Sequence, residues 1–176
     1  GLELVSSMIH SVLGPEQIDI PVVIGGGIGH GRQLAAVLGM GADGVLIGTR
    51  VLVAEEVWSH AEVKKQIVNS GAADSTLVMS SFRNTSRVIN NEFARAVQSL
   101  ELDGIKDFDQ YWPYVKGANA FDAYKSGDWN KALLSMGQSA VFADSVQPME
   151  QIYDNLIDEA AAALERLRGL RTSKTG

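Results

Sequence analysis

Two glycine clusters stand at the ends of short apolar runs, where free backbone groups could bind an anion. Gly25-Gly26-Gly27 follows the run at residues 21–24, and Gly48-Thr49 follows the run at residues 45–47. Glycine has no Cβ, so a phosphate can approach the backbone N–H groups that such turns leave unbonded. A strand that ends in this way and leads into a helix is a common phosphate site. The pattern predicts phosphate binding; the alternative is that the glycines only permit tight turns.

A third glycine pattern does not indicate a nucleotide site. Gly39-Met40-Gly41-Ala42-Asp43-Gly44 has the spacing of the dinucleotide-binding fingerprint. That fingerprint leaves a strand and opens a helix, whereas these glycines leave a predicted helix and open a predicted strand. We therefore exclude it.

The clusters are positioned by a predicted α-β-α-β order. Apolar spacing predicts a helix over residues 2–13, β-branched content predicts a strand over 18–24, and the same criteria predict a helix over 31–38 and a strand over 44–48. The strand starts at Pro21 and Gly44 are separated by a length normal for a right-handed crossover. We expect parallel strands, each buried on both faces, with both clusters at the same edge.

The rest of the chain has mostly helical patterns. We predict helices over residues 61–69 and 88–100, a helix starting near Asp128, and a long amphipathic helix from Pro148 to about Leu167. Tyr111, Trp112 and Tyr114 form an aromatic cluster that we expect to pack this helical part; the alternative is a wall beside a ligand.

Composition excludes several classes of protein. The 176 residues are 45% apolar and 20% charged, as in globular domains. The net charge of −6 disfavours nucleic acid and anionic membranes. No cysteine is present, and the three histidines are isolated, so we expect no metal site. No run is long and apolar enough for a membrane span, and the start does not read as a signal peptide, so we expect a cytoplasmic protein. Because residue 1 is not methionine, we expect a longer gene product.

Three segments resemble the nitronate monooxygenases, formerly called 2-nitropropane dioxygenases. Residues 21–32 and 41–50, which contain the glycine clusters, are similar to the FMN-phosphate segment of that family. Residues 81–88 with Asn91, and Gly127-Asp128 leading to residues 135–140, are similar to two later family segments. The matches run from about Pro21 to Leu164, which is the C-terminal half of a typical member.

The resemblance implies where FMN would bind. Its phosphate would lie on the backbone N–H groups of Gly26, Gly27, Gly48 and Thr49, with the Thr49 hydroxyl as a further donor, and Gln138 would lie near the flavin. The family's catalytic histidine precedes Gly1, so the catalytic residues are expected upstream of this chain. His10, His30 and His60 receive no catalytic role; His30 stands where the family usually has an acidic residue, and His10 and His60 read as surface or capping residues.

The implied protein is an α/β oxidoreductase that oxidises alkyl nitronates with O₂. Residues 1–100 would be the C-terminal βα units of a partial (β/α)8 TIM barrel, and residues 101–176 a helical region packed on it. Two strands cannot close a barrel, so the isolated chain is expected to be inactive without its N-terminal half or a homo-oligomeric partner. A split-gene product and a non-catalytic remnant or assembly module remain open, as do a flavin-dependent enoyl reductase and an IMP dehydrogenase-like barrel.

Overall fold

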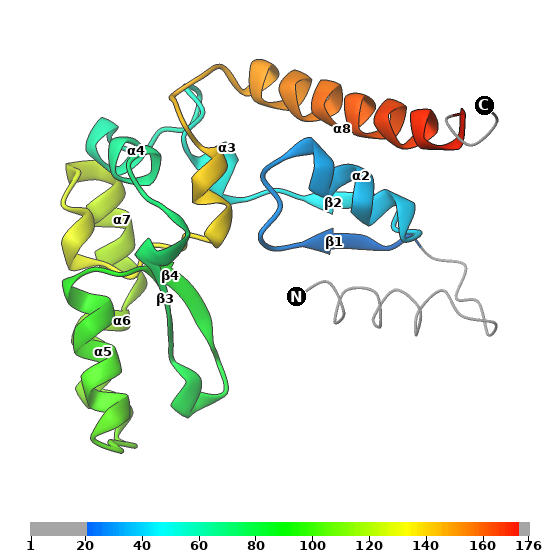
Figure 1. Cartoon of the computed structure of the whole chain (residues 1–176). Coiled ribbons are helices and arrows are strands. Elements are labelled where there is room, and N and C mark those ends of the chain that lie inside the picture. Colours follow the sequence, from blue (N-terminus) through cyan, green and yellow to red (C-terminus); the bar gives the residue numbers. More distant parts are fainter. Residues whose placement is uncertain (1–20, 173–176) are drawn as a thin grey trace. The chain divides into compact units, whose positions relative to one another are not determined.

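The computed structural model describes residues 21–172 (Figure 1). The predicted helix over residues 2–13, His10, and the start of the first predicted strand lie outside the described residues. The chain divides into two compact units, one made of residues 1–47 with 150–176 and the other of residues 48–149. The expected division at residue 100, which rests on the family resemblance, stays a prediction.

A parallel βαβ motif forms the first unit, as predicted. Strand β1 (Val23–Gly25), helix α2 (Gly31–Gly39) and strand β2 (Gly44–Leu46) follow in order, and β1 pairs with β2 so that Gly25 lies opposite Leu46 (Figure 1). Backbone N–H of Asp43 donates to Val22 O at 2.9 Å, which extends the pairing toward the start of β1. The chain therefore leaves both strands at the same edge of the sheet.

Among residues 21–172, side chains bury one face of this sheet and leave apolar side chains exposed on the other. Ile24 and Val45 pack with Ile28, Val37 and Ala42 in a small core beneath α2. The alternate residues point the other way, and Val23 is 59% exposed and Leu46 69% exposed. The prediction of strands buried on both faces is wrong for the described residues, because α2 covers one face and leaves the opposite one open.

Helix α8 (Met149–Thr172) confirms the amphipathic pattern at the end of the chain. Its Ile152, Leu156 and Ala160 are buried. A Cβ on Gly31 would clash with backbone atoms of Leu156 and Ala160. The first residue of α2 therefore touches α8 through its bare backbone.

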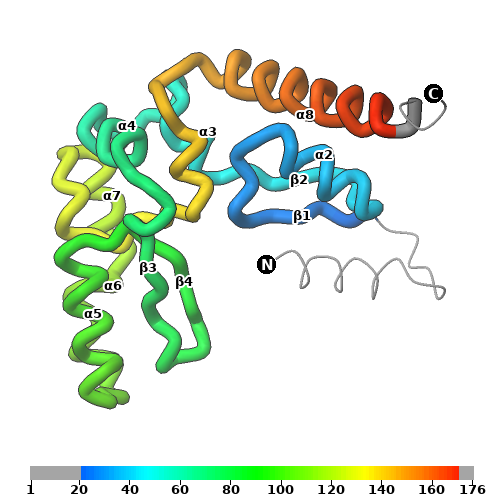
Figure 2. The backbone as a smooth tube through the Cα atoms, in the orientation of Figure 1, coloured from blue at the N-terminus to red at the C-terminus, as the bar shows by residue number. Residues whose placement is uncertain are grey.

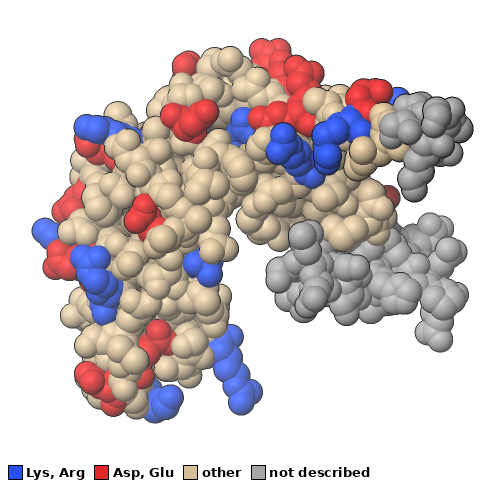
Figure 3. All heavy atoms as spheres, viewed as in Figure 1, with Lys and Arg blue, Asp and Glu red and all other residues tan. Residues whose placement is uncertain are grey.

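The second unit contains the remaining elements. Its helices and strands are α3 (Thr49–Leu52), α4 (Ala61–Val68), β3 (Ser75–Val78), β4 (Ser86–Ile89), α5 (Glu92–Leu102), α6 (Phe108–Val115) and α7 (Gly117–Ser126). Four short 3₁₀ turns, η1 (Ala72–Asp74), η2 (Ser80–Phe82), η3 (Trp129–Lys131) and η4 (Gln138–Phe142), connect them. Figure 3 shows acidic and basic side chains interspersed on the face of this unit that it draws.

Two predicted helices of this unit need correction. Strands β3 and β4 form an antiparallel hairpin, so Val88 and Ile89 end a strand and the helix α5 begins only at Glu92 (Figure 2). The helix expected near Asp128 is a single 3₁₀ turn. The chain after it is extended along β4 because Ile89 N–H donates to Leu134 O at 2.9 Å and Met136 N–H to Arg87 O at 3.2 Å. The helix predicted over residues 61–69 is confirmed as α4.

Two apolar clusters hold the unit together. One gathers α4, the end of β4 and the 132–143 segment around Ile67, Ile89 and Leu134. The other gathers the hairpin, α5 and α6 around Val78, Val97 and Tyr111. Among the described helices, none combines the length and apolarity that a membrane span requires.

Candidate functional site: glycine turns and the segments that hold them

The turn after β1 has the conformation and the open space that an anion needs. Gly26 and Gly27 have φ angles of +97° and +73°, in the left-handed region that side chains disfavour. A Cβ added to either glycine would meet no atom within 4 Å. Within residues 21–172, the N–H groups of Gly26 and Gly27 donate to no acceptor. Two adjacent N–H groups with free space beside them suit a phosphate oxygen.

Gln33 holds this turn in place and was not identified from the sequence. Its Nε2 donates to Gly27 O at 2.9 Å, and its Oε1 accepts from the N–H groups of Gly29 at 2.9 Å and His30 at 3.1 Å. Gln33 is the third residue of α2, and His30 caps the helix by accepting from Arg32 N–H at 3.1 Å. A capping residue followed by glutamine three positions later is the available sequence signal.

We predict that Gln33→Ala loosens the turn without unfolding the chain. The change removes three hydrogen bonds at a partly exposed site, so the free energy of unfolding should fall by about 1–2 kcal/mol. The amide protons of Gly29 and His30 should exchange faster with solvent, which NMR can measure residue by residue. Gln110→Ala, at an exposed position on α6, is the matched control and should leave both amides unchanged. Unchanged amide exchange in Gln33→Ala would show that the hydrogen bonds of Gln33 are not needed to hold the turn.

The N-terminus of α2 is already bonded to a carboxylate. Gly31 N–H donates to Glu159 Oε2 at 2.7 Å, and His30 Nδ1 lies 3.2 Å from the same oxygen. Glu159 belongs to α8, 128 residues further along the chain. The first N–H of α2 is thus used within the protein, whereas the N–H groups of Gly26 and Gly27 are unbonded within residues 21–172. His30 acts as a helix cap.

The second glycine cluster opens the other unit. Within the described residues, the N–H groups of Gly48 and Thr49 also donate no hydrogen bond. Thr49 is only 7% exposed, and its Oγ1 accepts from Gly137 N–H at 2.8 Å. The hydroxyl predicted to bind a phosphate therefore contacts residues 135–140, one of the segments that resemble the family. Gln138 follows directly, is exposed, and begins η4.

The other residues singled out from the sequence have structural roles. His60 caps α4, where its Nδ1 accepts from Glu62 N–H at 3.2 Å. Tyr111 is fully buried and donates to Ile105 O at 2.9 Å, and the Tyr114 ring packs edge-on against Phe93. Trp112 is 55% exposed beside Phe108. The packing role expected for the tyrosines is confirmed. No three His, Asp or Glu side chains among the described residues are arranged to hold a metal ion.

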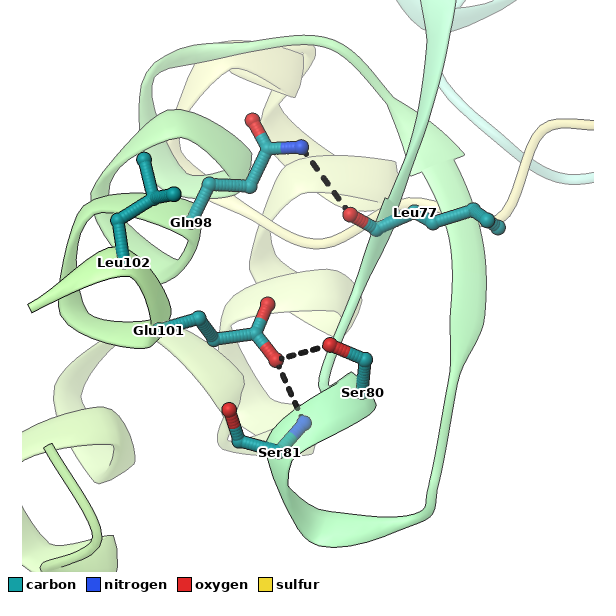
Figure 4. Close-up of a pocket in the computed structure, with 6 residues that line it drawn as sticks. All are labelled: Leu77, Ser80, Ser81, Gln98, Glu101 and Leu102. Atoms are coloured by element: carbon teal, nitrogen blue, oxygen red, sulfur yellow. Dashed lines mark hydrogen bonds between the residues drawn. The ribbon is translucent and has the colours of Figure 1, made fainter. Parts of the chain in front are cut away.

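Glu101 holds the turn between β3 and β4, inside the segment that resembles the family. Its carboxylate accepts from Ser80 Oγ and Ser81 N–H, both at 2.9 Å, and from Met79 N–H at 3.2 Å beside an open hollow (Figure 4). Met79 and Arg83, at the two ends of the turn, have φ angles of +66° and +55°. Partial burial alone would raise the pKa of Glu101, but these hydrogen bonds outweigh it and lower the pKa.

Acidification should release this turn. Because the pKa of Glu101 is lower in the folded chain than its ordinary value of 4.5, its contribution to stability is present above that value and disappears as the pH falls through the lowered pKa. We expect the amide signals of Met79 and Ser81 to move together in an NMR titration below pH 4.5. Glu101→Gln should remove that step, and a step that persists in the variant would assign it to another group.

Comparison with known proteins identifies the family. The family model described as nitronate monooxygenase matches residues 2–159. The chain belongs to the nitronate monooxygenase family. A probable nitronate monooxygenase of Staphylococcus haemolyticus is 31% identical over 87% of this chain and 42% of its own length. A Rhodococcus jostii relative named (3aS,4S,5R,7aS)-5-hydroxy-7a-methyl-1-oxo-octahydro-1H-indene-4-carboxyl-CoA dehydrogenase is 26% identical over 93% of this chain and 56% of its own.

Two solved structures of this fold are also similar. FabK from Thermotoga maritima superposes with a TM-score of 0.83 at 29% identity, over 95% of this chain and 50% of that one. Nitroalkane oxidase from Streptomyces ansochromogenes gives a TM-score of 0.71 at 27% identity, over 94% of this chain and 45% of that one. This nitronate monooxygenase family member thus spans about half the length of the relatives it matches.

Proposed function

We propose that this chain supplies the phosphate-binding part of an FMN-dependent oxidoreductase that oxidises alkyl nitronates with O₂. The observation that carries the proposal is the pair of left-handed glycines, Gly26 and Gly27, whose N–H groups are unbonded within residues 21–172 and whose Cβ positions are open. Membership of the nitronate monooxygenase family supports the same assignment.

The residues present fit a phosphomonoester. Gly26, Gly27, Gly48 and Thr49 provide backbone N–H groups, which are hydrogen-bond donors only, and Thr49 adds a hydroxyl. Phosphate oxygens are acceptors, so every contact pairs a donor with an acceptor. Gln33 keeps the Gly27–His30 turn open, and Gln138 offers an exposed amide that could bond a flavin carbonyl or ring nitrogen. When bound, the flavin supplies the electron transfer from substrate to O₂, and these residues bind and orient it.

The chain is further proposed to form the last strands of a (β/α)8 barrel. Strands β1 and β2 pair in parallel, and the apolar Val23 and Leu46 are exposed on one face of the pair. Both features suit a sheet whose remaining strands lie in a further segment. The relatives' additional length is consistent with an N-terminal half that would also carry the catalytic base. We propose the N-terminal half as the partner of this chain, with a second copy of the chain as the alternative. The proposed location is the cytoplasm.

A second candidate is a dehydrogenase or reductase of acyl thioesters. The specific observation is the Rhodococcus relative, named as a carboxyl-CoA dehydrogenase and aligned over 93% of this chain. The same phosphate site would serve either reaction, because it contacts the cofactor and not the substrate. The two reactions are separated by their products.

The test begins with the purified 176-residue chain. We predict FMN binding with a dissociation constant of about 1 mM, as expected for a few hydrogen bonds without walls around the ring, and no turnover. The binding is followed by NMR and the turnover by nitrite release from an alkyl nitronate. Tight binding with turnover would show that the chain already carries the catalytic residues.

The second experiment fuses this chain to the C-terminal end of the N-terminal half of the Staphylococcus haemolyticus relative. We expect the chimera to bind FMN tightly and to release nitrite from a nitronate. Oxidation of a reduced nicotinamide with an enoyl thioester, without nitrite release, would favour the second candidate. A folded chimera that excludes FMN would overturn both.

A further inference from the structure

The Thr49 hydroxyl joins two segments that lie 88 residues apart in the sequence. Gly137 N–H donates to Thr49 Oγ1 at 2.8 Å. A Cβ on Gly137 would lie 3.3 Å from the same oxygen, which is closer than ordinary contact allows. Thr49 is 7% exposed and Gly137 is half-buried, so this bond is partly shielded from water. The contact lies entirely within the unit of residues 48–149.

The bond determines what else the hydroxyl can do. A threonine hydroxyl has one hydrogen to donate and lone pairs to accept with. The Gly137 N–H occupies an acceptor site, and among residues 21–172 the Thr49 hydroxyl hydrogen meets no acceptor. A ligand that only accepts hydrogen bonds, such as a phosphate, would accept the Thr49 hydroxyl hydrogen. It would not compete with the Gly137 N–H, which donates to Thr49 Oγ1.

Gly137 also sets where Gln138 lies. Gly137 is the N-cap of η4, and Ala140 N–H donates to Gly137 O at 3.1 Å. Ser139 and Ala140 are buried, whereas Gln138 is exposed. The backbone of Gln138 is thus held between the Thr49 contact on one side and a buried turn on the other.

We infer that Thr49 is a positioning residue that couples phosphate binding to the placement of Gln138. Its hydroxyl donates to the FMN phosphate while accepting from Gly137 N–H, so one side chain links the phosphate end of the cofactor with the residue proposed to contact the ring. The inference rests on the proposed function and adds a role for Thr49 beyond holding the phosphate. The ligand that Thr49 would bind is a phosphomonoester of a flavin.

The test uses NMR of the full chain with FMN as the probe and follows the amides of Gly137 and Gln138. Thr49→Val keeps the shape but removes both the acceptor and the donor, whereas Thr49→Ser keeps both. Without ligand, the Gly137 amide should exchange about fivefold faster in Thr49→Val than in wild type, as for loss of one partly buried hydrogen bond, and Thr49→Ser should restore protection. Thr49→Ala is measured in parallel in case valine disturbs folding.

Adding FMN should shift the Gly137 and Gln138 amides in wild type and Thr49→Ser. In Thr49→Val, the Gly137 shift should be lost at FMN concentrations that still shift the amides of Gly26 and Gly27. Thr76→Val is the matched control: it removes a hydroxyl that accepts from Gln98 Nε2 at 2.6 Å, far along the chain from Gly137, and should leave both responses intact.

The outcomes separate the inference from the proposed function. Unchanged Gly137 exchange in Thr49→Val and Thr49→Ala would overturn the inference. So would FMN shifts at Gly137 that are equal in wild type and Thr49→Val while Gly26 and Gly27 respond in both, and the proposed function would stand in that case. If FMN shifts none of Gly26, Gly27 and Gly48 in wild type, the proposed function fails and the inference with it.

Discussion

Replacing Gly27 with valine should remove most of the response of this chain to FMN. Gly27 has φ +73°, and a β-branched residue there costs about 1–2 kcal/mol in backbone strain. An added Cβ meets none of the protein's own atoms within 4 Å, so the side chain would instead fill the space proposed for a phosphate oxygen. We expect the FMN-induced amide shifts at Gly26 and Gly48 to fall by at least about tenfold, equivalent to losing one charge-assisted hydrogen bond.

Gly104→Val is the matched control for this experiment. Gly104 has φ +70° and open space around its Cβ position, but it follows α5 and belongs to neither glycine cluster. Both variants should lose similar stability in urea, whereas only Gly27→Val should lose FMN binding. Riboflavin, which lacks the phosphate, should respond weakly and equally in both. Parallel losses of FMN and riboflavin binding in Gly27→Val would indicate that Gly27 supports the fold and does not contact the phosphate.

Thr49→Ala, by comparison, should weaken FMN binding by less. It removes one hydroxyl and leaves the backbone N–H groups in place, at a cost of about 0.5–1.5 kcal/mol.

Replacing Asn91 with alanine should lower the free energy of unfolding by about 3 kcal/mol. Asn91 is 1% exposed and caps α5, where its Oδ1 accepts from Ala94 N–H at 2.9 Å. Its Nδ2 donates to Trp129 O and Ala132 O, both at 2.7 Å. The substitution removes the cap and leaves two carbonyl groups without donors, one of them in a fully buried bond. Urea unfolding followed by circular dichroism measures the loss.

Asn130→Ala is the control for Asn91. Asn130 Oδ1 accepts from Glu92 N–H at 3.0 Å in an exposed bond, so its removal should cost under about 1 kcal/mol. Equal losses in the two variants would show that the buried network around Asn91 contributes little beyond an ordinary cap.

The parts of the fold that the sequence predicts are those with local signals. Apolar runs closed by glycine predict β1 and β2, and regular apolar spacing predicts α2, α4 and α8. The β3–β4 hairpin was missed because each strand has four residues and Val88-Ile89 also fit a helical stripe. The helix expected near Asp128 was wrong because Leu133 follows Trp129 at the helical spacing of four residues, yet this segment bonds to β4.

The candidate site divides in the same way. Left-handed glycines could be expected at Gly26 and Gly27 because glycine is the residue that tolerates that conformation. The residues that hold the turns could not be predicted, because they bond to residues far away in the sequence and their types occur throughout the chain. Glu159 reaches Gly31 across 128 residues, and Gly137 reaches Thr49 across 88. Such pairs arise from tertiary packing, which no local pattern encodes.

The contact between Gly31 and α8 limits how this protein can evolve. Any side chain at position 31 would press on the backbone near Leu156 and Ala160, which cannot retreat as a side chain can. Gly39, at the other end of α2, has no atom within 4 Å of its Cβ position and no left-handed φ. Among descendants of this sequence, position 39 is therefore free to drift toward alanine, whereas position 31 can change only if α8 moves with it.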